Sequence, residues 1–205
     1  IIENNLTVGP RDLIDYLIRF YTEQGVKDVN KNTHLELINF FRDRMKNILK
    51  EKKVRPDIIE ASLSSHNNDN FLELYKKTLV MNKFISKDLG KNAVSTYKRA
   101  YNIIDREKNI SKSGPDAVLF KQDEEKELFD KINDIRKAFT YKEKKESYEN
   151  HLKLLSDAKL STDKFFDNVK VNDENNDIKN NRLELLQRLC STFNTFIDFS
   201  KLEGN

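Results

Sequence analysis

The sequence predicts an all-α fold, a helical bundle. Along most of its 205 residues the apolar side chains recur at intervals of three and four, as they do on one face of a helix, and no stretch alternates convincingly with period two. Five glycines and three prolines are too few to punctuate a β-sandwich, a barrel or a series of βαβ units. Thirteen phenylalanines and seven tyrosines nevertheless supply enough bulky apolar surface for a core, so the chain is expected to fold.

The helices expected in the first half of the chain have clear starting points. Pro10 suits the first position of a helix, and apolar residues follow it at helical spacing. Thr33 and Glu36 have the spacing of a capping box, which predicts a second helix beginning at Thr33. Pro56 opens a short third helix, and a fourth is expected at about residues 71–86.

The second half repeats this pattern. A connector is expected at residues 109–115, where serines precede a Gly-Pro pair. Phe165 and Phe166 are expected in the core as part of a short helix that plugs the bundle. The final helix is expected to carry an apolar stripe from Leu183 to Ile197. The other helices are expected at about residues 92–106, 124–139 and 143–156.

Basic residues gather in two blocks, although the formal net charge is only +3. Residues 42–55 hold seven basic and two acidic side chains, and residues 76–112 hold ten and three, so the remainder of the chain is net acidic. A positive surface attracts polyanions and speeds their association. The distribution therefore favours a nucleic-acid partner, while ordinary solvated helix faces remain the alternative.

No catalytic or metal-binding signature is found in the sequence. His34, His66 and His151 stand far apart, without the spacing of metal ligands, so neither a metal nor a cofactor is expected. The isolated glycines exclude a phosphate-binding loop. Cys190, the single cysteine, lies on the apolar stripe of the last helix and is expected to be a small buried residue. No secretory signal or membrane span is apparent, so a cytoplasmic location without a membrane partner is expected.

Two tyrosines and two basic residues stand together in the second basic block. Tyr97 and Tyr101 are one helical turn apart and are expected on one face, from which Lys98 and Arg99 point away. In one interpretation the rings are buried and the basic residues are only solvated. In the other, Lys98 and Arg99 contact phosphates, Asn102 lies near a base edge and aromatic faces stack on unpaired bases.

Four separated segments carry motifs in a fixed order. They are Phe41-Arg42-Asp43-Arg44-Met45 with Asp57-Ile58-Ile59-Glu60-Ala61; Tyr97-Lys98-Arg99-Ala100-Tyr101-Asn102-Ile103-Ile104; Asp163-Lys164-Phe165-Phe166-Asp167-Asn168-Val169-Lys170-Val171; and Asn181-Arg182-Leu183-Glu184-Leu185-Leu186. In this order and spacing they resemble the C-terminal region of the β subunit of bacterial heterotetrameric glycyl-tRNA synthetase. Lys170 stands where that family's pattern has Met, and Ile104 where it has Leu.

The resemblance implies an anticodon-binding domain similar to that of arginyl-tRNA synthetase, which shares the last two segments and is the closest competing relative. It implies that residues 1–32 end the preceding β-subunit region and that residues 33–205 form the helical domain, with a sub-boundary at 109–115. The implied partners are tRNA(Gly) and the α subunit of the heterotetramer. ATP is used by the whole enzyme, and this region is expected to be non-catalytic and free of cofactors. A helical protein-interaction module is the alternative from a different class.

The motif that opens the last helix adds two polar candidates. Asn181 and Arg182 are expected just before that helix, where they either cap it with a surface ion pair or contact RNA. The complete set of candidate tRNA contacts is Arg42, Arg44, Lys46, Tyr97, Lys98, Arg99, Asn102, Asn181 and Arg182.

Overall fold

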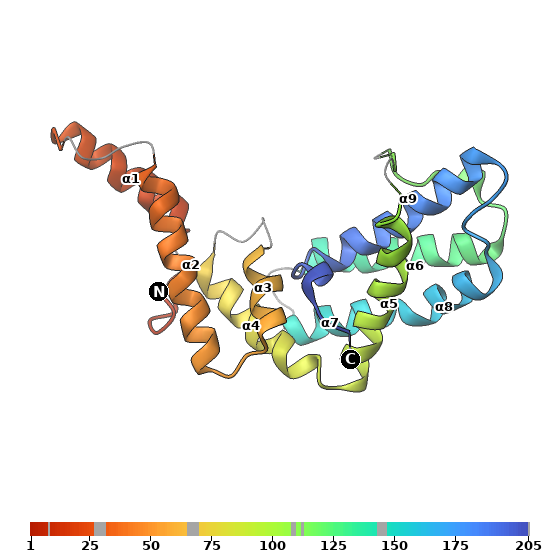
Figure 1. Ribbon diagram of the computed structural model, residues 1–205, viewed down its shortest axis with the longest axis horizontal. Helices are drawn as coiled ribbons and strands as arrows, with labels where there is room; N and C mark the ends of the chain where they lie inside the picture. The colour runs from red at the N-terminus through yellow and green to blue at the C-terminus, as the bar shows by residue number, and fades with distance from the viewer. Residues whose placement is uncertain are drawn as a thin grey trace. The chain divides into compact units, whose positions relative to one another are not determined.

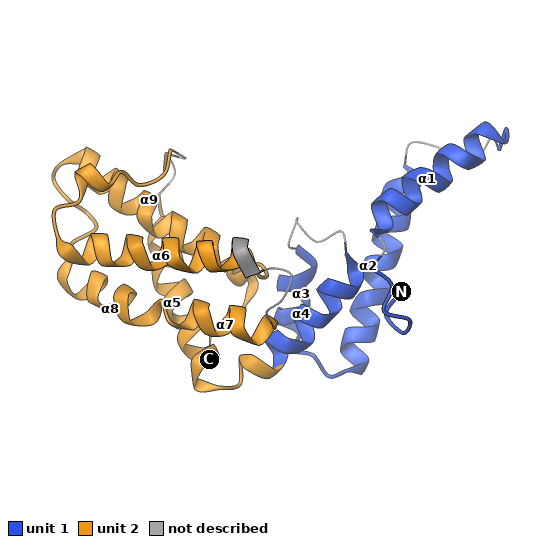
Figure 2. Ribbon diagram, turned by 180° about the vertical axis from the view of Figure 1, so that it is seen from behind, with its two compact units in different colours: residues 1–82 blue, residues 83–205 orange. Residues whose placement is uncertain are grey.

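The computed structural model describes residues 1–7, 9–26, 32–64, 70–107, 110–111, 113–142 and 147–204. Those residues form α-helices and short 3-10 helices and contain no strand, which confirms the all-α prediction (Figure 1). They fall into two compact units, residues 1–82 and residues 83–205 (Figure 2). The sequence placed its divisions at residue 32 and within residues 109–115, and those domain boundaries remain predictions. Residues 109 and 112 of the expected connector lie outside the described residues.

Unit 1 contains three complete helices and most of a fourth. They are α1 (Pro10–Glu23), α2 (Thr33–Glu51), α3 (Pro56–Ser64) and α4 (Phe71–Phe84). The core consists of side chains that α2 and α3 bury against their neighbours, among them Met45, Leu49, Ile58 and Ile59. In Figure 2, α1 lies beside α2 and away from α3 and α4.

Unit 2 is built around its last long helix. Its elements are α5 (Asp88–Ile104), the 3-10 helix η1 (Ala117–Leu119), α6 (Asp123–Lys142), α7 (Tyr148–Ser156), α8 (Lys159–Asn168), α9 (Asn176–Phe193) and the 3-10 helix η2 (Phe199–Lys201). Helix α9 packs against both α5 and α6, while α8 packs on α6 and α7 on α5. Six consecutive residues, 181–186, are buried, so α9 faces other elements on all sides along this stretch.

Several local expectations hold and others fail. Every expected helix is present, but the last begins at Asn176, seven residues before the expected Leu183, and residues 143–146 of the expected 143–156 helix lie outside the described residues. Asn32 occupies the N-cap position of α2 and makes no side-chain cap hydrogen bond, so Thr33 is the first residue of the helix and not its cap. Phe165 is fully buried as expected, but Phe166 is only half-buried, because α8 presents it at the edge of the core.

Candidate nucleic-acid interface

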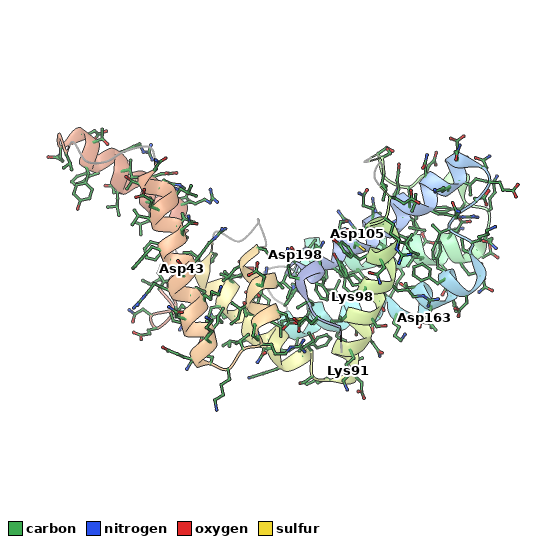
Figure 3. All side chains as sticks on the ribbon, in the orientation of Figure 1. Asp43, Lys91, Lys98, Asp105, Asp163 and Asp198 are labelled. Atoms are coloured by element: carbon green, nitrogen blue, oxygen red, sulfur yellow. The ribbon has the colours of Figure 1, made fainter. Side chains whose placement is uncertain are left out.

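Helix α5 has one apolar face and one polar face. Ala93, Val94, Tyr97 and Ala100 are buried on the first. The second carries Lys91, Ser95, Lys98 and Asn102, spaced by four, three and four residues, so their side chains line one side of the helix. We call these four residues the α5 polar stripe; Figure 3 labels its two lysines.

Lys91, Ser95 and Lys98 of the α5 polar stripe border a groove of about 380 Å³ within unit 2. Its apolar wall is formed by Ile85 and Val94, and the C-terminal residues Glu203 and Gly204 close its other side. Lysines are point charges suited to phosphate, whereas hydroxyl and amide groups donate and accept hydrogen bonds at base edges. The groove therefore combines an apolar wall with phosphate-binding and base-binding chemistry, and Glu203 is the one acidic residue among the described residues that line it.

The two adjacent basic residues of α5 have different surroundings. Lys98 has no carboxylate partner in the described part of the chain and lines the groove. Arg99 instead contacts α8: its guanidinium lies 4.5 Å from the centre of the Phe166 ring, 3.3 Å from Asp163 Oδ1 and 3.5 Å from Asp167 Oδ1. Its charge is compensated by two carboxylates and its planar group rests on an aromatic face. Lys98 is thus the better phosphate ligand of the pair, and Arg99 joins α5 to α8.

The two tyrosines share one face of α5, as predicted. Their ring centres are 5.5 Å apart and their ring planes are nearly parallel. Tyr97 is only 1% exposed, packs on Phe193 and Phe199, and accepts a hydrogen bond from Asn194 Nδ2 at 3.3 Å. Burial raises the pKa of its hydroxyl well above the usual range, so it stays neutral. Tyr97 is a core residue in this structure and offers no face to a base.

The expected position of Arg182 is wrong. It lies inside α9, which begins six residues earlier at Asn176 and is capped by Asn175. Arg182 is 4% exposed, and its guanidinium donates from Nε to Glu125 Oε1 and from Nη1 to Asp173 Oδ2, both at 2.8 Å. Burial alone would lower the pKa of Arg182, but Glu125 and Asp173 raise it above its ordinary value. The ion pair that was the alternative to an RNA contact is present, but it is buried and not at the surface, and Arg182 does not cap the helix.

Asn181 is misplaced for the same reason. Its amide Oδ1 accepts from the Asp116 backbone N–H at 2.7 Å, and its Nδ2 donates to the Asp116 carbonyl at 3.0 Å. One buried side chain thus satisfies both polar groups of a residue next to the expected connector. Asn181 holds this segment on α9 and is not exposed to a ligand in this structure.

The three candidates in the first basic block do not lie on one side of α2. Arg42 and Lys46 lie four residues apart on one side of α2, whereas Arg44 lies on another side. Arg44 borders an apolar groove with Phe40 and Met45. These candidates belong to unit 1 and the α5 polar stripe belongs to unit 2, so each is described separately.

Sequence reasoning missed two members of the stripe. Lys91 precedes Lys98, and Ser95 precedes Asn102, by seven residues or about two helical turns, and that spacing was readable in the sequence. Among the described residues there is no group of His, Cys, Asp and Glu side chains that could hold a metal ion. In the same part of the chain, no helix has the length and apolar character needed to span a membrane.

Comparison with known proteins gives consistent results. Residues 93–201 match the family model described as the DALR anticodon binding domain. A glycine–tRNA ligase beta subunit of Rickettsia africae (strain ESF-5) is 35% identical over 202 residues, covering 98% of this chain and 29% of the relative. That of Rhodospirillum centenum is 34% identical over 174 residues, covering 82% of this chain and 24% of the relative. The chain therefore spans less than a third of the length of these relatives.

Proposed function

The chain belongs to the DALR anticodon-binding domain family, and from this we propose that it is the tRNA-binding module of a glycine–tRNA ligase β subunit. The observation that carries the proposal is the position of the α5 polar stripe. The family match begins at residue 93 and includes Ser95, Lys98 and Asn102, and the first two of these border a groove with an apolar wall. Its partners would be tRNA(Gly) and the α subunit, in the cytoplasm.

The groove suits an unpaired stretch of RNA. Bases of an anticodon loop can be splayed out, so they present flat apolar faces and hydrogen-bonding edges. Lys91 and Lys98 would neutralise phosphates, which positions the strand but carries no sequence information. Ser95 and Asn102 would offer hydrogen bonds to base edges, and Val94 an apolar surface. In this proposal the module binds and orients tRNA, while ATP-dependent glycine activation takes place with the α subunit.

Titration of tRNA(Gly) at several salt concentrations tests the proposal. Each phosphate contact that is lost should reduce the slope of log affinity against log salt by roughly 0.7 for single-stranded RNA. We expect Lys98→Ala to weaken binding and flatten the slope without changing the melting temperature. The matched control is Lys126→Ala, which removes an exposed lysine from α6 and should change neither.

A second variant and a second tRNA distinguish the proposal from an arginyl-type module and from a protein-interaction module. Arg99→Ala should lower the melting temperature because it removes the contacts to Asp163, Asp167 and Phe166. Its effect on the salt slope should be smaller than that of Lys98→Ala. Tighter binding of tRNA(Arg) than of tRNA(Gly) would favour an arginyl-type module. Absence of any salt-dependent tRNA binding would refute the proposal and favour the protein-interaction module.

A further inference from the structure

The first helix exposes an unusual amount of apolar surface. Leu13, Tyr16, Leu17 and Phe20 are spaced as one face of α1 and are 43%, 60%, 39% and 44% exposed. An adjoining side of the helix buries Ile14. We call these four exposed residues the α1 apolar stripe. Single exposed apolar side chains need no explanation, but a continuous row of large ones marks an interaction surface.

Apolar exposure continues onto the helix beside it. On α2, Leu37 is 37% exposed and Phe40 is 57% exposed, one turn apart. Phe40 also borders a groove of about 370 Å³ that contains Phe41, Ile48 and Phe71. Unit 1 thus offers an apolar helix face and an apolar groove on neighbouring helices, α1 and α2.

The chemistry of this surface fits protein and not RNA. Helix α1 carries two basic side chains, Arg11 and Arg19, and three acidic ones, Asp12, Asp15 and Glu23. It therefore lacks the positive charge that attracts phosphates. Apolar anchors at positions i, i+3, i+4 and i+7 are those of a helix that lies in an apolar protein groove.

We propose that the α1 apolar stripe docks onto the part of the glycine–tRNA ligase β subunit that lies outside the region matched by this chain. The inference rests on the proposed function. In the Rickettsia africae relative, 71% of the polypeptide lies outside the match, which provides a large protein surface linked to the matched region. Docking there would remove the four large side chains from water, each burial contributing to affinity by the hydrophobic effect.

The test is a chimera in which this chain replaces the matched 202 residues of the Rickettsia africae subunit. Hydrogen exchange of the α1 amides is measured in the chimera and in the chain alone. A docked helix opens less often, so we expect exchange in α1 to slow by about tenfold or more in the chimera. Peptides from α3 should exchange equally in both proteins, which shows that unit 1 is folded in each.

A triple variant identifies the surface responsible. Leu13→Ser, Leu17→Ser and Phe20→Ser together should abolish the protection in the chimera and leave the helix content of the chain unchanged, because these side chains are exposed. The matched control is Val118→Ser with Leu160→Ser, which changes side chains that are 84% and 67% exposed in unit 2 and should retain the protection.

Three outcomes would overturn the inference. The α1 amides could exchange equally fast in the chimera and in the chain alone, or their protection in the chimera could survive the triple substitution. The chain could also self-associate in a way that the triple substitution abolishes. The last would identify a second copy as the occupant. The tRNA titration is run on the triple variant of the chain as well. If the chain binds tRNA but α1 is not protected in the chimera, the docking inference is rejected and the proposed function stands. If α1 is protected in the chimera but the chain does not bind tRNA, the proposed function is rejected and the docking inference stands.

Discussion

Glu125 is the buried acceptor on which the Arg182 network depends, and Glu125→Ala is expected to destabilise unit 2 strongly. The carboxylate is 0% exposed; it accepts from Arg182 Nε and from the backbone N–H groups of Lys121 and Gln122, each at 2.8 Å. Its removal leaves the two N–H groups without that acceptor and leaves the guanidinium with Asp173 as its only carboxylate partner among the described residues. Breaking a buried pair by removing one partner costs about 3–5 kcal/mol.

The loss is a large share of the stability of a domain, which is about 5–15 kcal/mol. Urea unfolding followed by circular dichroism should show this loss as a midpoint lowered by about 1 M or more, since the free energy of unfolding falls by about 1–3 kcal/mol per molar urea. The matched control on the same helix is Glu127→Ala. Glu127 and Lys164 form an exposed pair at 2.9 Å, whose loss should cost less than about 1 kcal/mol. Equal midpoints for the two variants would refute the reasoning, and Glu125→Gln provides a milder variant should Glu125→Ala not fold.

Two further predictions concern the core. Phe165→Ala should lower the free energy of unfolding by about 3–5 kcal/mol because the ring is fully buried. Phe166→Ala should lower it clearly less, because one face of that ring lies under Arg99. Thermal melts compare the two variants, and a larger loss of stability for Phe166→Ala would contradict the structure. Cys190 is 3% exposed, and burial raises the pKa of its thiol to about 12, so almost no reactive thiolate is present at pH 8. Its modification by a disulfide reagent should therefore be slow in the native protein and fast in urea, and rapid native labelling would contradict the buried position.

The helices were predictable because their signals are local. The spacing of apolar residues and the prolines at positions 10 and 56 determine where helices form, and both can be read from neighbouring residues. The face shared by Tyr97 and Tyr101 was predictable for the same reason, since it follows from helical geometry alone.

The roles of the polar residues were not predictable in the same way. Lys98 and Arg99 are adjacent and both basic, and only the position of α8 makes Arg99 an ion-pair partner. Arg182 pairs with a carboxylate 57 residues away in the sequence. Such partners are determined by tertiary packing, which the periodicity of a single helix does not contain. Lys91 is the exception, because its place in the stripe follows from spacing.

The central position of α9 has a consequence for synthesis of the protein on the ribosome. Helices α5 and α6 both pack against α9, which is translated dozens of residues later. Domains fold as units when their chain is available, at a synthesis rate of about 5–20 residues per second. Until the end of α9 and the residues after it leave the exit tunnel, Tyr97 lacks Phe193 and Phe199, which pack on its ring in the folded unit. The nascent chain therefore leaves this part of the unit 2 core uncovered for seconds before α9 is available.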